Sequence, residues 1–144
     1  MDDIFGKYAN GTLDLMLQTE AGLDGTFGEN LNISVDSSNF EAIRAEVLLS
    51  KEIEVDTSEI GLEKIEFRLS LFHENFPQFE WFGKYYDDYE VYFFSPSEVR
   101  EFLAECQKMQ SLVNSETAIL TLRKLTYAFN QALEKNLYLG FICD

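Results

Sequence analysis

The sequence contains few of the residues from which catalytic and metal sites are usually built. It has one histidine, His73, and two cysteines, Cys106 and Cys143, in 144 residues. One histidine excludes a two-histidine metal site, and two isolated cysteines do not form a disulfide framework. The spacings of a glycine-rich phosphate loop and of a calcium-binding loop are also missing. We therefore predict no cofactor, no metal and no enzymatic activity, with free thiols in a reducing cytoplasm.

Basic residues are also scarce, since 11 Lys and Arg stand against 26 Asp and Glu, for a net charge of −15. Residues 1–60 are the most acidic part, with thirteen acids and three bases. Nucleic acids and anionic membranes attract basic patches, so the composition argues against both and favours a basic protein partner. No apolar run reaches the roughly 18 residues of a membrane span, and we expect no secretion signal.

Aromatic residues, by contrast, crowd into one stretch, since nine of the sixteen residues in 79–94 are Phe, Tyr or Trp. We interpret this stretch as a β-hairpin that turns at Asp87-Asp88, where Asp tolerates the backbone of a tight turn. Tyr86 would then face Tyr89, Phe82 would face Phe93 and Trp81 would face Phe94. Both faces of such a hairpin are apolar. Either it is covered on both sides in the core, or one face is offered to a partner.

Alternation of apolar and polar residues predicts several more strands. It is clear in residues 12–19, 27–35 and 63–72, and residues 137–142 form a short last strand. The first two should pair as a hairpin. Residues 38–56 are ambiguous, because Ser38 to Glu41 resembles a helix start whereas the apolar positions have a period of two. We interpret 38–56 as a strand, with Lys64 and Arg68 of the following strand near its acidic row.

Two helices follow the aromatic stretch. Ser95, Pro96 and Glu98 form a strong helix start, with Ser as N-cap, Pro at the first position and Glu at the third. The apolar stripe of this helix is Val99, Phe102, Leu103, Cys106, Met109 and Val113. A second helix opens at Ser115 and runs to about Asn136. Cys106 lies on the apolar stripe, where a buried, inert thiol is expected.

The sequence thus predicts one α+β domain over residues 1–144. An antiparallel meander sheet comes first, then a helical hairpin packed on one face of the sheet, then a short C-terminal strand.

The candidate partner-binding residues combine negative charge with aromatic rings. They are the hairpin tip and an acidic row: Tyr85, Tyr86, Asp87, Asp88, Tyr89, Glu90, Glu46, Glu52, Glu54 and Asp56. An acidic face speeds encounter with a basic partner, and aromatic anchors slow its release.

Small size, strong acidity, an aromatic and acidic hairpin and the lack of a catalytic set together resemble bacterial toxin-immunity proteins of the contact-dependent-inhibition type. The resemblance lies in overall character, and no motif carries it. It implies a cytoplasmic inhibitor that binds a basic toxin, such as a nuclease, and blocks its active site or surface.

Two other functions fit the same composition. Secretion chaperones of the type III class are also small, acidic α+β proteins, which hold an effector segment along apolar grooves and sheet edges. However, they open with a helix, whereas both strong helices come late here. A nucleic-acid mimic would need a nearly continuous acidic surface. The helical region is instead mixed in charge, because it carries Arg100, Arg123, Lys124 and Lys135.

Overall fold

The computed structural model describes residues 4–5, 12–19, 28–55 and 61–143. In chain order its elements are β1 (Leu13–Gln18), β2 (Glu29–Val35), α1 (Ser37–Leu49), α2 (Leu62–Asn75), β3 (Tyr92–Phe94), α3 (Pro96–Met109), α4 (Glu116–Lys135) and β4 (Tyr138–Cys143). The α+β prediction is confirmed. No helix in the described part is long and apolar enough to cross a bilayer.

The four strands form one antiparallel sheet in the order β2-β1-β4-β3. The strands predicted at 12–19, 27–35 and 137–142 are confirmed, and so is the pairing of the first two. The order departs from a meander, because the C-terminal strand β4 inserts between β1 and β3. Both faces of β1 are buried, including Met16 on the side opposite Leu15, so neither face of this strand is free for a partner.

Residues 37–49 form helix α1, so the strand predicted over 38–56 is wrong. The N-cap is Asp36, whose carboxylate accepts the Asn39 amide while the Asn39 side chain accepts the Asp36 amide. The period-two pattern misleads because burial does not follow polarity in this helix. Arg44, a polar residue, is fully buried, whereas the apolar Leu49 is 51% exposed.

The strand predicted over 63–72 is also wrong, because residues 62–75 form helix α2. Its buried positions are Ile65, Arg68 and Phe72, which follow the helical spacing of three and four residues. Phe67 completes the apparent alternation but points to solvent. The cross-strand pairing expected for Lys64 and Arg68 therefore does not exist, and Arg68 instead bonds Glu41 of α1.

The aromatic stretch is not a hairpin. Only Tyr92–Phe94 forms a strand, and it pairs with β4, with Tyr92 opposite Phe141 and Phe94 opposite Leu139. The chain before it is irregular, because its backbone groups bond buried charged side chains rather than a second strand. Nη1 of Arg44 donates to the carbonyls of Phe82 and Lys84, at 3.1 Å each. The Glu105 carboxylate accepts the amides of Trp81 and Phe82 at 3.0–3.2 Å.

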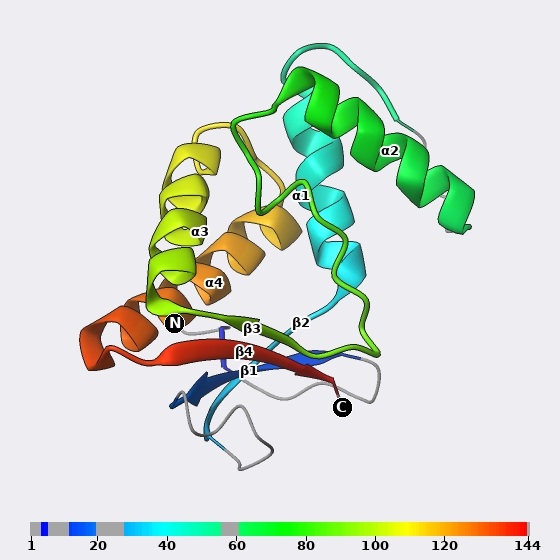
Figure 1. Cartoon of the computed structure of the whole chain (residues 1–144). Helices are drawn as coiled ribbons and strands as arrows, with labels where there is room; N and C mark the ends of the chain where they lie inside the picture. Colours follow the sequence, from blue (N-terminus) through cyan, green and yellow to red (C-terminus); the bar gives the residue numbers. More distant parts are fainter. Residues whose placement is uncertain (1–3, 6–11, 20–27, 56–60, 144) are drawn as a thin grey trace.

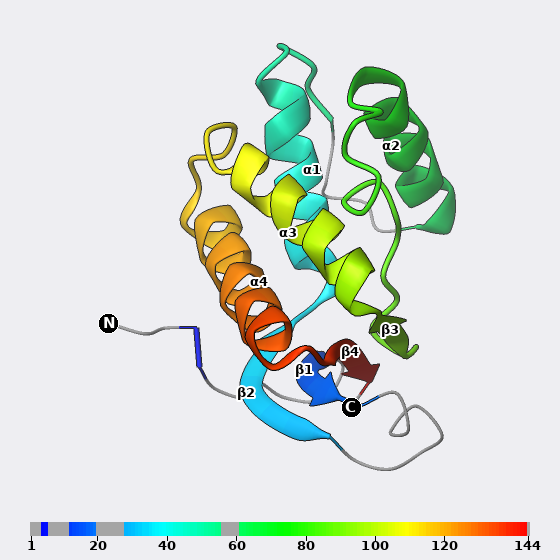
Figure 2. The ribbon, with the colours of Figure 1, turned by 60° about the vertical axis from the view of Figure 1, so that its left-hand side comes forward.

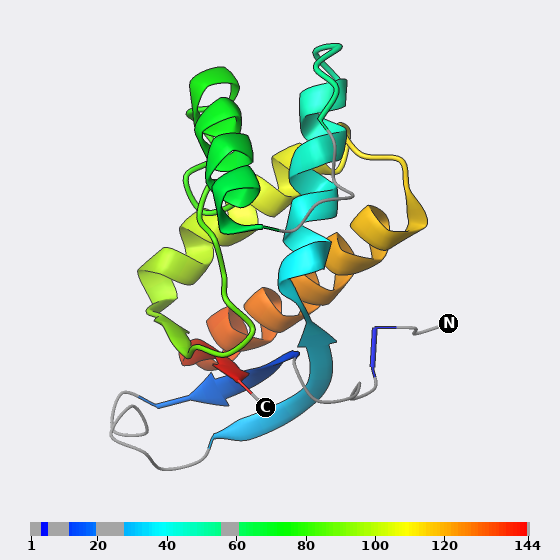
Figure 3. The ribbon, with the colours of Figure 1, turned by 90° about the vertical axis from the view of Figure 1, so that its right-hand side faces the viewer.

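The helical hairpin is confirmed where it was predicted. Ser95 caps α3 with Pro96 at its first position and Glu98 completing the capping box, and Ser115 caps α4. The whole predicted stripe of α3 is buried. All four helices lie on one side of the sheet, with α2 farthest from it (Figures 1, 2 and 3).

Aromatic rings from the irregular stretch before β3 pack against both the helices and the sheet. Tyr86 lies 4.9 Å from Phe40 of α1, 6.0 Å from Phe102 of α3 and 5.5 Å from Phe141 of β4, measured between ring centroids. Phe102 continues the cluster to Phe129 of α4 at 4.7 Å. Phe79, Trp81, Phe82 and Tyr86 are thus part of the core, as expected if the aromatic stretch is covered by the rest of the protein.

Candidate functional site

The predicted hairpin tip divides into a buried part and an exposed part. Tyr86 is 2% exposed, and its hydroxyl donates to the Trp81 carbonyl at 2.8 Å, so its role is structural. Burial raises the pKa of Tyr86 well above its usual value. Tyr85 is half-buried in a hollow between α1 and α2, whereas Tyr89 is 78% exposed. Tyr86 is therefore excluded from direct contact with a partner.

The two aspartates of the tip hold the loop in place. The Asp88 carboxylate accepts the backbone amide of Ser37 at 2.8 Å and its hydroxyl at 3.1 Å, at the first residue of α1. Burial raises the pKa of Asp88, and these two bonds partly oppose the rise. Asp87 accepts the Tyr89 amide at 2.9 Å and donates its own amide to the Tyr92 hydroxyl at 2.8 Å. The loop is therefore fixed on both sides of Tyr89.

This loop exposes a small aromatic and acidic surface to solvent, which we call the tip patch. It consists of Tyr89, Glu90, Val91 and Phe93. Val91, just before β3, is 44% exposed, and Phe93 within the strand is 36% exposed. Phe93 lies over Gly140 of β4, where a Cβ atom would come within 3.3 Å of its ring. Among the described strands, β3 is an edge of the sheet, so the patch also borders a sheet edge.

The acidic row lies at the other end of α1. Glu52 and Glu54 are exposed just after the helix, and Asp56 lies outside the described residues. Glu46 has a structural role, because its carboxylate accepts the amides of Asn114 and Ser115 and the Ser115 hydroxyl at the start of α4. Burial raises the pKa of Glu46, but these bonds outweigh it and the net shift is downward. The predicted residues therefore form two sites rather than one.

A hollow of about 460 Å³ lies beside the acidic row, and we call it the α1 groove. Its walls are mostly apolar, with two carboxylate residues among them: Ala42, Ala45, Glu46, Leu49, Ile53, Glu54, Val55 and Ser115. The apolar members come from successive turns of α1 and from the chain that folds back after it. The sequence pattern missed this groove because it assigned both segments to one strand.

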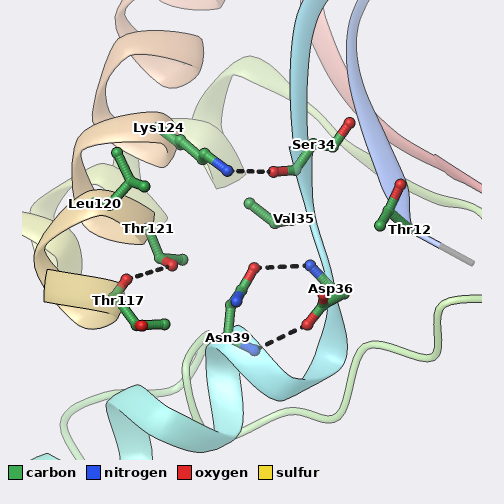
Figure 4. Close-up of a pocket in the computed structure, with 9 residues that line it drawn as sticks. All are labelled: Thr12, Ser34, Val35, Asp36, Asn39, Thr117, Leu120, Thr121 and Lys124. Carbon is green, nitrogen blue, oxygen red and sulfur yellow. Dashed lines mark hydrogen bonds between the residues drawn. The ribbon is translucent and has the colours of Figure 1, made fainter. Parts of the chain in front are cut away.

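A second hollow, of about 230 Å³, contains a buried lysine between α4 and β2 (Figure 4). Lys124 donates to the Ser34 carbonyl at 2.8 Å, and burial lowers its pKa while Asp36 opposes the shift. Asn39 and Asp36 bond each other in the cap of α1, and Thr121 bonds the Thr117 carbonyl. A cationic ligand here would lie near Lys124, and an anionic ligand would lie near Asp36. We therefore assign these groups a structural role rather than a binding role.

Comparison with known proteins adds no relative. No family model, curated protein or solved structure matches this chain. Within the described residues, no group of three or more His, Cys, Asp or Glu side chains is placed to hold a metal ion. Cys106 is buried, and burial raises the pKa of its thiol well above the usual value, as expected for an inert cysteine. The tip patch and the α1 groove are therefore the candidate sites.

The burial of basic side chains makes the surface of the described part of the chain more acidic. Arg44, Arg68 and Lys124 are buried, whereas Asp14 and Glu105 are the only buried acids in the described part of the chain. Both guanidinium groups bond the same carboxylate, Glu41. The exterior is consequently richer in carboxylates, relative to cations, than the composition alone suggests.

Proposed function

We propose that this protein is a small acidic inhibitor that binds a basic protein, in the manner of a bacterial immunity protein that neutralises a toxin domain such as a nuclease. The observation that carries the proposal is the tip patch. Tyr89 stands 78% exposed next to Glu90, on a loop whose backbone is held by Asp87 and Asp88. An exposed ring on a fixed loop is the arrangement that a binding surface needs.

The fixed loop supports binding because association loses less entropy when an anchor is already ordered. Tyrosine is enriched among the residues that dominate binding energies, since it buries a large ring and keeps a polar end. Val91 and Phe93 extend the apolar area beside Tyr89, and Glu90 supplies charge at its border. The patch therefore has an apolar centre and an acidic edge.

The charge of the whole surface supports the choice of a basic partner. Carboxylates that outnumber exposed cations attract a positively charged surface and accelerate encounter. The active sites of nucleases are commonly basic, because they bind phosphates. An inhibitor of this kind acts in the cytoplasm of the cell that makes it, and the free thiols of Cys106 and Cys143 fit a reducing compartment.

The test takes the purified proteins encoded by the genes adjacent to this one, and the proposal predicts that one of them is a toxin domain that binds this protein. We expect a stable complex and loss of toxin activity at a stoichiometric ratio. Replacing Tyr89 with Ala should raise the Kd about 30-fold, which corresponds to the roughly 2 kcal/mol of an anchor residue. The control is Ile119→Ala, which removes an apolar side chain that is 43% exposed on α4 and should leave the Kd unchanged. Absence of a complex, or equal effects of the two variants, would contradict the proposal.

A further inference from the structure

The α1 groove and the tip patch are joined by a rigid element of known length. Asp88 bonds Ser37 at the first residue of α1, and Leu49 at its last residue lines the groove. A helix of 13 residues is about 20 Å long. Both ends of α1 are visible from one side of the molecule (Figure 3). A standard protein interface buries about 800 Å² on each partner, which is wide enough to span this distance.

The chemistry of the groove selects one kind of occupant. Its apolar walls, formed by Ala45, Leu49 and Ile53, suit the methylene chain of a long side chain. Glu54 lines the groove and is exposed, so its carboxylate can pair with a cationic head group. Lysine and arginine are the side chains that combine an apolar stem with such a head.

A second copy of this protein is a poor occupant. A two-fold symmetric contact through the groove would bring Glu52 and Glu54 of one copy towards the same residues of the other. Like charges placed together in an interface are destabilising, and the net charge of −15 adds to the repulsion. Charge complementarity therefore points to a basic partner rather than to self-association.

We propose that the partner bound at the tip patch also inserts a lysine or arginine side chain into the α1 groove, so that α1 sets the distance between the two contacts. This inference rests on the proposed function and adds to it the chemistry and the spacing of the second contact. The partner must carry an apolar cleft for Tyr89 and a protruding basic side chain that reaches the groove, which begins at Ala42 in the second turn of α1.

A groove-filling substitution tests this inference. Ala45→Leu adds three carbons to the groove wall on a half-exposed position of α1, and leucine is a good helix former. The matched control is Ala104→Leu on the exposed face of α3. Both variants should keep the parent's circular dichroism spectrum and melting temperature within a few degrees.

With the toxin domain encoded beside the gene, we expect Ala45→Leu to raise the dissociation rate at least tenfold and Ala104→Leu to leave it unchanged. Equal dissociation rates for the parent and Ala45→Leu, in a complex that Tyr89→Ala still weakens, would overturn the groove contact and leave the proposed function intact. A parent that forms no complex would overturn both. Light scattering that shows a dimer of the parent, lost in Ala45→Leu, would identify a second copy as the occupant and overturn the inference.

Discussion

Glu41 is the residue on which the packing of α1, α2 and the aromatic loop depends. Its carboxylate bonds Arg44 at 2.9 Å and Arg68 from α2 at 3.0 Å. Arg44 in turn holds the carbonyls of Phe82 and Lys84. Burial lowers the pKa of Arg44, and the nearby Glu41 charge opposes the shift. One carboxylate thus bonds two largely buried guanidinium groups.

Replacing Glu41 with Gln should reduce the free energy of unfolding by about 3 kcal/mol, because the buried Arg44 guanidinium would lose its carboxylate and Arg68 would lose one of its ion-pair partners. Urea denaturation followed by tryptophan fluorescence measures the effect near the site, since Trp81 lies in the loop that Arg44 holds. Glu63→Gln, on the exposed side of α2, is the control and should change stability by less than about 0.5 kcal/mol. A loss for Glu41→Gln as small as that of the control would show that the carboxylate is dispensable.

The tyrosines of the tip show what composition reveals about single residues and what it does not. The sequence pointed to rings and carboxylates gathered around Asp87-Asp88, and Tyr89 and Glu90 are indeed exposed there. Tyr86 has the same chemistry three positions earlier, yet it is enclosed by Phe40, Phe102 and Phe141. These three neighbours are distant in the sequence, so no local pattern separates the exposed Tyr89 from the buried Tyr86.

At the scale of elements, predictions succeeded where local signals agreed with burial. The N-caps of α3 and α4 lie where they were predicted, and the apolar residues of both helices coincide with their buried faces. Predictions failed in α1 and α2, because Arg44 and Arg68 are buried whereas Leu49 and Phe67 are exposed. The hairpin failed because Arg44 and Glu105 supply the hydrogen bonds that a second strand would have made. Such charged partners come from other elements and leave no periodic signal.

Glu46 connects two elements, and its contribution should depend on pH. The bonds from Asn114 and Ser115 favour the charged carboxylate and lower its pKa below the usual 4.5. The stabilisation is therefore complete above that value and is lost as the pH falls through the lower pKa of the folded state. We expect Glu46→Gln to cost about 1 kcal/mol at pH 7, the usual worth of a helix cap.

The measurement is the difference in unfolding free energy between the parent and Glu46→Gln, taken from urea titrations at pH 7 and at about pH 3. The difference should shrink at the lower pH, because the parent carboxylate gains protons as the pH falls towards its lowered pKa. Burial raises the pKa of Glu105 and Asp88, so their contributions to stability change with pH in the opposite direction. Both groups are present in the parent and in the variant, so these contributions cancel in the difference between the two proteins. A difference that stays constant between the two pH values would contradict a charged cap.

At the scale of the whole molecule, the fold separates the charges. It encloses Arg44, Arg68 and Lys124 and leaves most carboxylates outside, so the surface that a partner meets is strongly acidic. The tip loop lies at the right of the molecule in Figure 1 and the C-terminal end of α4 at the left, so the two ends of the surface can be changed independently. This separation allows long-range attraction to be distinguished from local contact.

The most direct test of the account compares two charge reversals that alter the net charge equally. Glu90→Lys changes the tip patch, and Glu134→Lys changes an exposed position near the C-terminal end of α4. Stopped-flow association with the toxin domain encoded beside the gene, measured over a range of salt concentrations, gives the association rate for each. We expect Glu90→Lys to slow association about tenfold at low salt and to flatten the dependence of the association rate on salt. Glu134→Lys should change the association rate much less. Equal slowing by both variants, or no association by the parent, would contradict the account.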